Sequence, residues 1–205
     1  LLLAGLAVVQ PSPPWQLLRM AAIASQVKQT EIVYYGVGRS ATVMLQQSAE
    51  GWQISSNGLA EAQISRPGVR AGRYVMVRWM SNLPAWGRPE ARSILIVGFG
   101  GGLIVEAVPP NFEQIDVVEL ESEMIQASQH IAAERRIDAL SDPRLELIVN
   151  DARSALLLTE ERYDAIVSQP SHPWTAGASH LYTREFFQLA RDHLADDGVF
   201  VQWMG

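Results

Sequence analysis

The stretch SILIVGFGGG, residues 93–102, sets the fold of the second half of the chain. An apolar, strand-like run leads directly into a glycine cluster, and the apolar segment LIVEAV (103–108) follows as the start of a helix. Glycines at such a turn allow the backbone to approach a ligand, and the helix N-terminus adds free amides. A tight turn that binds nothing gives the same pattern. The stretch alone therefore predicts a strand–turn–helix unit and marks four candidate cofactor-binding positions: Gly98, Gly100, Gly101 and Gly102.

Apolar strands and amphipathic helices alternate after this unit, which is typical of a parallel α/β sheet. The expected strands span residues 115–120, 145–150, 163–169 and 198–204, and the expected helices span 122–137 and 183–194. Residues 89–205 are therefore predicted to form a Rossmann-like, nucleoside-binding domain.

Acidic residues end the second and third strands. Glu119 lies 19 residues beyond Gly100, where a carboxylate of this fold accepts hydrogen bonds from a ribose diol. The alternative, a solvated carboxylate at a helix start, fits Glu121 better. Asp151, followed by Ala152, can accept from an adenine amine or can cap the next helix. Because ligands of open parallel sheets gather at the carboxyl ends of strands, these features together predict one nucleoside site.

The loop after the fourth strand reads SQPSHPW, residues 168–174. In a nucleotide-binding α/β fold such a loop lies over the reacting end of the cofactor. His172 is a candidate acid or base, because imidazole is the side chain whose ordinary pKa lies nearest neutrality, and Gln169 lies in the same loop. The alternative is a histidine that only fixes the loop. Trp174 is expected either to wall the pocket or to close an edge of the core.

The first half of the chain has a different pattern. Residues 31–66 alternate in a β-like way between glycine-containing turns, which predicts a small antiparallel sheet. Residues 67–88 are helical in the middle, with an expected break at Pro84 and a hinge into the next block. The predicted domains are an apolar stub and linker (1–30), a small β domain (31–88) and the Rossmann-like domain (89–205).

Composition excludes several function classes. The net charge is −6 and the basic residues are scattered, so nucleic acid is not an expected partner. The chain has no cysteine, which excludes disulfides, thiol nucleophiles and thiolate metal sites. Its four histidines lack a spacing such as HExxH, so no metal is expected.

The first nine residues, LLLAGLAVV, are entirely apolar and precede a PSPPW break. Nine residues are too few to span a bilayer, which needs about 20 in a helix. The segment fits the end of a membrane helix with its interfacial exit, and it fits the end of a buried helix equally well.

Several stretches together resemble the spermidine synthase family of aminopropyltransferases, and most closely its bacterial members fused to membrane segments. The resemblance covers residues 34–203, and its most specific part is YDAIVSQPSHPWTAGASHLYTREFF, residues 163–187. Other matching stretches are YYGVGRSATV, ILIVGFGGG, DVVELE and DPRLELIVNDAR.

This resemblance implies a small β domain beside a Rossmann-like domain, in a homodimer whose chain continues past residue 205. The implied cosubstrate is decarboxylated S-adenosylmethionine, with Glu119 on its ribose, Asp151 on its adenine and the glycine loop on the rest. The implied partner is a small amine, and the implied reaction is an SN2 transfer without a metal. A membrane fusion further implies a cytoplasmic domain tethered to the inner face of the plasma membrane, with residues 1–9 as the tail of the preceding span.

The sequence departs from the family pattern at the reacting end. Gly101 stands where the family has an aspartate in the glycine loop. In the loop after the fourth strand, Gln169 stands where the family has an aspartate general base, and His172 replaces a second aspartate. Arg73 and Arg78 stand where acidic residues are expected to hold a diamine. These changes argue against spermidine as the product and make His172 the candidate replacement base. The alternatives are a methyltransferase that uses S-adenosylmethionine and a non-catalytic sensing or structural module of a membrane protein.

Overall fold

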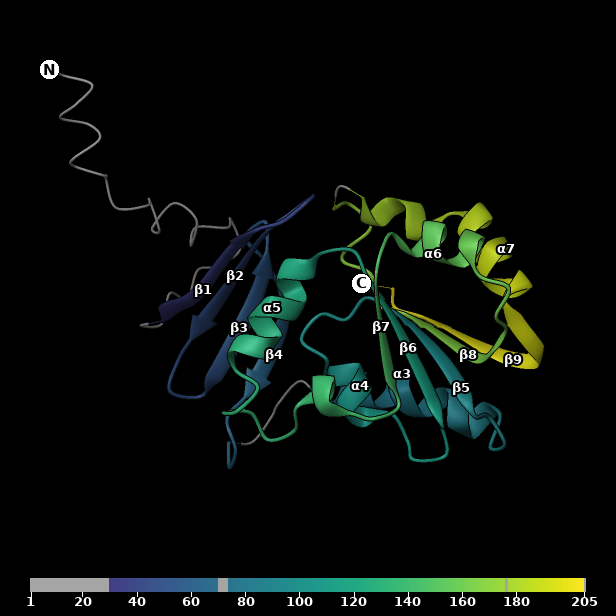
Figure 1. Cartoon of the computed structure of the whole chain (residues 1–205), viewed down its shortest axis with the longest axis horizontal. Coiled ribbons are helices and arrows are strands. Elements are labelled where there is room, and N and C mark those ends of the chain that lie inside the picture. The colour runs from purple at the N-terminus through teal and green to yellow at the C-terminus, as the bar shows by residue number, and fades with distance from the viewer. Residues whose placement is uncertain (1–29, 70–73, 176, 205) are drawn as a thin grey trace, which may run out of the picture.

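The computed structural model describes residues 30–69, 74–175 and 177–204. The apolar segment 1–9 lies outside the described residues, as does Arg73. Two sheets lie side by side, a four-stranded antiparallel sheet and a five-stranded parallel sheet (Figure 1). This arrangement confirms the predicted fold class.

The N-terminal sheet has four strands in chain order, and each neighbouring pair is antiparallel. One face packs against helix α5 (Ser122–His130), which supplies Met124 and Ala127 to a shared core with Leu45 and Trp52. The strands are β1 (Glu31–Val37), β2 (Thr42–Gln47), β3 (Gly51–Ser56) and β4 (Leu59–Ser65).

Helix α3 (Tyr74–Gly87) continues through Pro84, so the expected break at that residue was wrong. Proline lies in the last turn, where it removes only one helical hydrogen bond, and the Arg88 amide bonds the Pro84 carbonyl at 2.8 Å. Val77 and Met80 of α3 belong to the core of the parallel sheet. The helix therefore packs with the second sheet although it precedes the domain boundary expected near residue 88.

The parallel sheet has the strand order β7-β6-β5-β8-β9. Helices α3 and α4 cover one face, and α6 and α7 cover the other (Figure 1). The strands are β5 (Ser93–Val97), β6 (Gln114–Glu119), β7 (Leu145–Val149), β8 (Tyr163–Ser168) and β9 (Leu194–Gln202). The helices are α4 (Leu103–Ala107), α6 (Ala152–Leu158) and α7 (Arg184–Asp192), with 3-10 turns η1 (Ala139–Ser141) and η2 (Ala178–Tyr182).

Two elements differ in length from the prediction. Helix α5 ends at His130 and not at residue 137, because the chain turns so that Arg135 can point into the core toward the Gly101 carbonyl. Strand β9 begins at Leu194, and its pairing with β8 shifts register between Tyr163 and Ala165. The strand expected to begin at residue 198 is thus four residues longer at its start, with an irregularity near that start.

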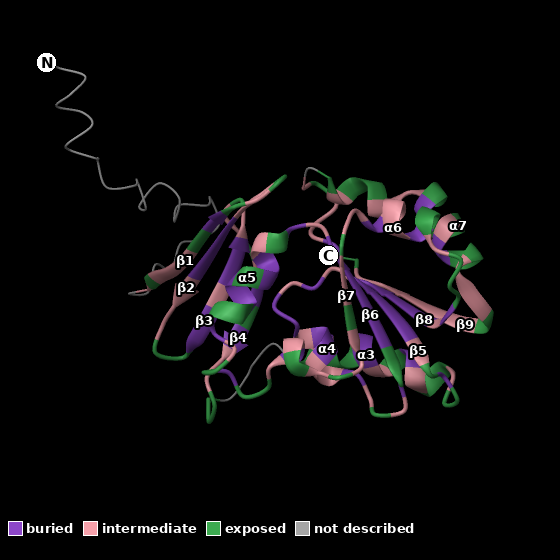
Figure 2. Ribbon diagram, viewed as in Figure 1, coloured by how far each residue is buried: buried purple, intermediate pink, exposed green. Residues whose placement is uncertain are grey.

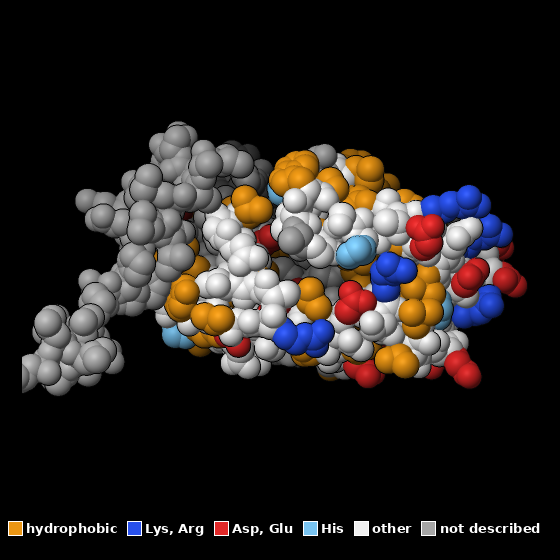
Figure 3. Space-filling view, turned by 90° about the horizontal axis from the view of Figure 1, so that it is seen from above, with side chains coloured by type: hydrophobic (Ala, Val, Ile, Leu, Met, Phe, Trp, Pro, Cys, Tyr) orange, Lys and Arg blue, Asp and Glu red, His pale blue; other side chains and the backbone are white. Residues whose placement is uncertain are grey.

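Burial follows the sheet order. The central strands β5, β6 and β8 are buried along most of their length, whereas β7 and β9 at the edges are more exposed (Figure 2). On the face seen in Figure 3, acidic and basic side chains are mixed at one end of the molecule, without a field of one sign. No helix within residues 30–69, 74–175 and 177–204 is both long and apolar enough to cross a membrane.

Candidate functional site

The strand order reverses at β5, and a cavity of about 150 Å³ opens at the carboxyl ends of β5, β6 and β8. This is where open parallel sheets bind their ligands. We refer to it as the strand-end cavity. It brings together six of the predicted site residues: Gly98, Gly100, Glu119, Asp151, Ala152 and Gln169.

Glu119 holds the glycine loop in place. Its carboxylate accepts hydrogen bonds from the amides of Phe99 (2.9 Å), Gly100 (3.4 Å) and Glu121 (2.9 Å). Burial raises the pKa of Glu119, and these amide bonds oppose the rise. Glu119 also lines the strand-end cavity, so its carboxylate can face a ligand there.

The glycines have different structural roles. Gly98 has a φ of +93°, and a Cβ there would lie 2.8 Å from the Gln169 carbonyl oxygen, so only glycine fits. Gly100 has a φ of +54° and faces open space in the strand-end cavity. Gly101 packs against β4, where a Cβ would lie 2.9 Å from the Ala62 side chain. Gly102 precedes α4 and does not line the strand-end cavity.

Asp151 caps helix α6. Its Oδ1 accepts from the Ser154 amide at 2.9 Å, and Ala152 is the first residue of the helix. Both residues also line the strand-end cavity. The alternative role of Asp151 as a helix cap is therefore confirmed. From the same position Asp151 can also face a ligand in the cavity.

Glu121 is not the solvated carboxylate that its position at the helix start predicts. It is 5% exposed and accepts hydrogen bonds from the Arg39 amide (2.9 Å), the Ser40 amide (2.6 Å) and the Ser40 hydroxyl. Glu121 thereby fixes the turn between β1 and β2 at the rim of the strand-end cavity, and Ser40 lines that cavity too.

A second cavity, of about 230 Å³, lies between β4, α3 and the loop after β8. We refer to it as the interdomain cavity. Gly101, Gln169 and His172 line it, and Gln169 also lines the strand-end cavity. The His172 ring stacks on Trp174 at 4.5 Å, and its Nδ1 is buried without a hydrogen-bond partner. Trp174 is 69% exposed and lines neither cavity, so it is neither a pocket wall nor part of the core.

Glu61 is the functional candidate that the sequence analysis missed. It lies on β4, lines both cavities and accepts a hydrogen bond from the Ser171 hydroxyl at 2.7 Å. Burial raises the pKa of Glu61, while the Ser171 bond and the charge of His172 oppose the rise. The alternation of residues 31–66 predicts that a glutamate such as Glu61 faces solvent, and no motif in the sequence indicates a place in a cavity.

Comparison with known proteins adds family evidence to this geometry. The family model described as "Spermine/spermidine synthase domain" matches residues 75–204, well over half of the chain. The chain belongs to the spermine/spermidine synthase family. Membership confirms the resemblance drawn from the sequence, apart from the membrane fusion, which the match does not address.

Curated members of the family are similar over the same region. Polyamine aminopropyltransferase 1 of Pseudomonas aeruginosa is 29% identical over 137 residues, which cover 66% of this chain and 48% of the relative. Polyamine aminopropyltransferase of Yersinia pestis is 28% identical over 134 residues, 64% of this chain and 45% of the relative. The chain thus spans about half the length of the curated relatives it matches.

Solved structures of the family share the fold. A spermidine synthase in complex with the transition-state analogue AdoDATO superposes with a TM-score of 0.70 at 20% identity, covering 83% of this chain and 57% of that one. The spermidine synthase of Thermotoga maritima gives a TM-score of 0.68 at 20% identity, with coverages of 83% and 56%. At these identities the likeness concerns the family's fold alone.

Proposed function

We propose that this domain binds decarboxylated S-adenosylmethionine and transfers its aminopropyl group to a small amine. The observation that carries the proposal is the strand-end cavity, in which the glycine loop, Glu119 and Asp151 meet at the strand-order reversal. Membership of the spermine/spermidine synthase family supports this choice among nucleoside ligands.

The residues fit the parts of the cosubstrate. Glu119 accepts from the ribose diol, and Asp151 accepts from the adenine amine. Gly98 and Gly100 bring their backbone against the ligand, and Gln169 lies at the boundary to the interdomain cavity, where the sulfonium end is expected. Phe99 does not line the strand-end cavity and Trp174 lines neither cavity, so neither side chain blocks the nucleoside site.

The reaction is a direct displacement at the carbon next to the sulfonium. It needs the two reactants held in line and the amine deprotonated, without a metal or a covalent intermediate. Gln169 cannot accept the proton, but it can orient the reacting groups through its amide. His172 has a buried, unpartnered ring nitrogen at the interdomain cavity and is one group that can accept it.

The proposal extends to the surroundings of the domain. A homodimer, a cytoplasmic location and a tether to a membrane segment upstream are expected from the resemblance to membrane-fused members of the family. Sedimentation of the full-length protein with membranes tests the tether, and light scattering of the soluble domain tests the dimer.

Calorimetric titration tests the proposed function. The ligands are decarboxylated S-adenosylmethionine, S-adenosylmethionine and methylthioadenosine, each titrated into the wild-type domain and into Glu119→Gln. Tight binding of the decarboxylated compound and of methylthioadenosine, weakened at least tenfold by Glu119→Gln, is the expected result. Preference for S-adenosylmethionine would move the assignment to methyl transfer. No binding of any of the three would leave a structural module.

A further inference from the structure

Glu61 stands out because of how the backbone presents it. In the pairing of β3 with β4, Ile54 faces Ala62 and Ser55 faces Ala60, so Glu61 is the extra residue of a β-bulge. Bulges re-aim a side chain that regular alternation would place elsewhere, and they are common next to active sites. Here the bulge turns the carboxylate toward the Ser171 hydroxyl, at the wall that the two cavities share.

We propose that Glu61 binds the ammonium group of the acceptor and takes its proton, and that the acceptor is a primary monoamine with an uncharged body. This inference rests on the proposed function, because it assumes that decarboxylated S-adenosylmethionine occupies the strand-end cavity. It assigns the role of base to Glu61 in preference to His172.

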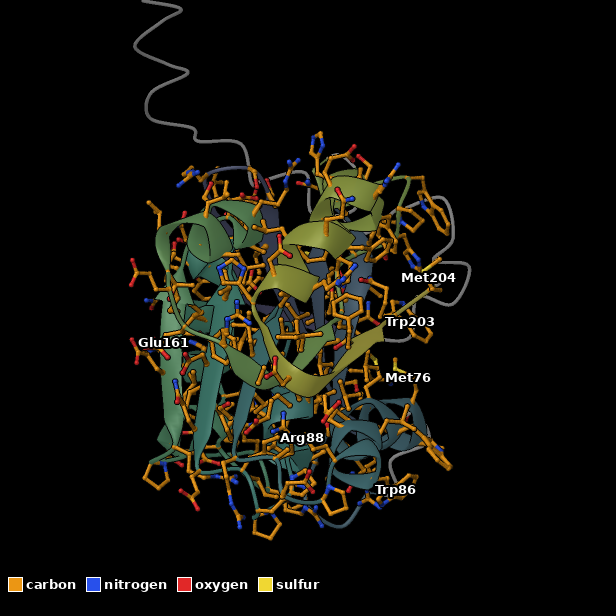
Figure 4. The ribbon with its side chains drawn as sticks, turned by 90° about the vertical axis from the view of Figure 1, so that its right-hand side faces the viewer. Met76, Trp86, Arg88, Glu161, Trp203 and Met204 are labelled. Carbon is orange, nitrogen blue, oxygen red and sulfur yellow. The ribbon has the colours of Figure 1, made fainter. Side chains whose placement is uncertain are left out.

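The chemistry of the interdomain cavity defines the acceptor class. Among its described lining residues, Glu61 is the only carboxylate. The other walls are mostly apolar side chains and amides, including Met76 and Trp203, which lie on the same side of the molecule (Figure 4). A diamine would place its second ammonium in this cavity without a carboxylate partner, and burying an unpaired charge is costly. An apolar or amide-bearing tail suits the same walls.

The Glu61 carboxylate suits the reacting amine of the acceptor better than the His172 imidazole does. Glu61 carries the charge that attracts an ammonium, and the Ser171 hydroxyl bond fixes its orientation. The titratable groups that act on it are His172 and Tyr182, and the Tyr182 hydroxyl bonds the Ser171 carbonyl at 3.0 Å. Of Glu61, His172 and Tyr182, only the carboxylate is of a type that ionises to an anion in the ordinary pH range.

The step balances in atoms and charge. The acceptor arrives as an ammonium and gives one proton to the Glu61 carboxylate. The freed nitrogen lone pair forms a bond to the aminopropyl carbon next to sulfur, and the electron pair of the breaking carbon–sulfur bond stays on sulfur. The products are a secondary ammonium, neutral methylthioadenosine and protonated Glu61, which returns its proton to water.

The first test compares acceptors of matched length. Wild-type protein is incubated with decarboxylated S-adenosylmethionine and either n-butylamine or 1,4-diaminobutane, and methylthioadenosine release and product mass are measured. The expected result is a kcat/KM for butylamine at least tenfold above that for the diamine. A preference for the diamine would overturn the acceptor class. If neither these amines nor a wider primary-amine panel releases methylthioadenosine, the proposed function fails together with this inference.

The second test separates Glu61 from a structural role. Glu61→Gln keeps the side-chain shape but cannot take a proton, and we expect kcat to fall by about 10²-fold or more. Glu160→Gln, at an exposed carboxylate beyond α6, is the matched control and should retain wild-type rates. Methylthioadenosine binding by calorimetry should be unchanged in Glu160→Gln and remain measurable in Glu61→Gln, which shows that the fold and the nucleoside site persist.

The pH profile supplies the decisive readout. In the wild type, kcat/KM should rise as Glu61 ionises and fall as the ammonium group of the unbound acceptor loses its proton, giving a bell shape. In Glu61→Gln the limb set by Glu61 ionisation should vanish. The remaining activity should increase with pH up to the pKa of the acceptor amine. Transfer at wild-type rate with an unchanged profile in Glu61→Gln would overturn the role of Glu61 and leave the proposed function intact. If His172→Ala, and not Glu61→Gln, removes the acidic limb, then the base is His172.

Discussion

Replacement of Arg135 by methionine should strongly destabilise the fold. The Arg135 side chain is 0% exposed and forms an ion pair with Glu106, which is 9% exposed. It also donates to the Ser128 hydroxyl and to the Gly101 carbonyl, both at 2.7 Å. Methionine fills similar space but leaves a buried carboxylate without its partner.

The expected cost follows from this burial. Breaking a buried ion pair by removing one partner costs about 3–5 kcal/mol. For a domain of this size that corresponds to a fall in Tm of roughly 6–20 °C. Urea unfolding and thermal denaturation followed by circular dichroism measure both quantities. Arg184→Met, at an exposed arginine at the start of α7, is the matched control and should change stability by less than about 0.5 kcal/mol.

The cost should also depend on pH. Burial raises the pKa of Glu106, and the charge and hydrogen bond of Arg135 oppose that rise, so Arg135→Met should raise the pKa further. A group whose pKa is raised by folding loses its favourable contribution as pH rises through the folded-state value. The destabilisation should therefore be larger at pH 8 than at pH 5. A loss below about 1 kcal/mol, or one independent of pH, would refute the reasoning.

Three further predictions concern other contacts. Gly101→Asp, which restores the aspartate of the family pattern, should destabilise by about 1–3 kcal/mol in urea unfolding, since its Cβ would lie 2.9 Å from the Ala62 Cβ. Burial and the hydrogen bond to Glu123 raise the pKa of Tyr34 to about 12, so ultraviolet titration should show one phenol that ionises at unusually high pH and is absent in Tyr34→Phe. The stabilising effect of the Tyr34 hydroxyl is present below pH 10 and lost toward pH 12. Although burial opposes it, hydrogen bonds from backbone amides lower the pKa of Asp164, so the stability difference between wild type and Asp164→Asn should shrink as pH falls from 6 to 3.

The sequence predicted the parts of the fold that local patterns specify. The apolar run 93–97 and the glycines after it became β5 and its turn, because a strand buried on both faces must be apolar throughout. Glu119 and Asp151 reached one cavity because the carboxyl ends of neighbouring parallel strands share an edge. These inferences needed no knowledge of long-range contacts.

The missed features depend on contacts between distant segments. Glu61 reaches the cavities through a bulge that is set by pairing with β3, which strand alternation does not encode. The end of α5 is fixed by what Arg135 contacts, at Gly101 and Glu106, about 30 residues earlier in the chain. Glu121 was expected in solvent because its partner, the turn at Ser40, lies in the other sheet.

The wall between the two cavities has an evolutionary consequence. Both spaces are lined by Glu61, Gly100, Gln169, Pro170 and Ser171, so each of them faces both molecules of the proposed reaction at once. Selection for a new acceptor cannot then alter this wall without also changing affinity for the nucleoside. Descendants of this domain should diversify at positions that touch only one space, such as Gln63 and Met76, while the shared wall changes rarely and in coordinated sets.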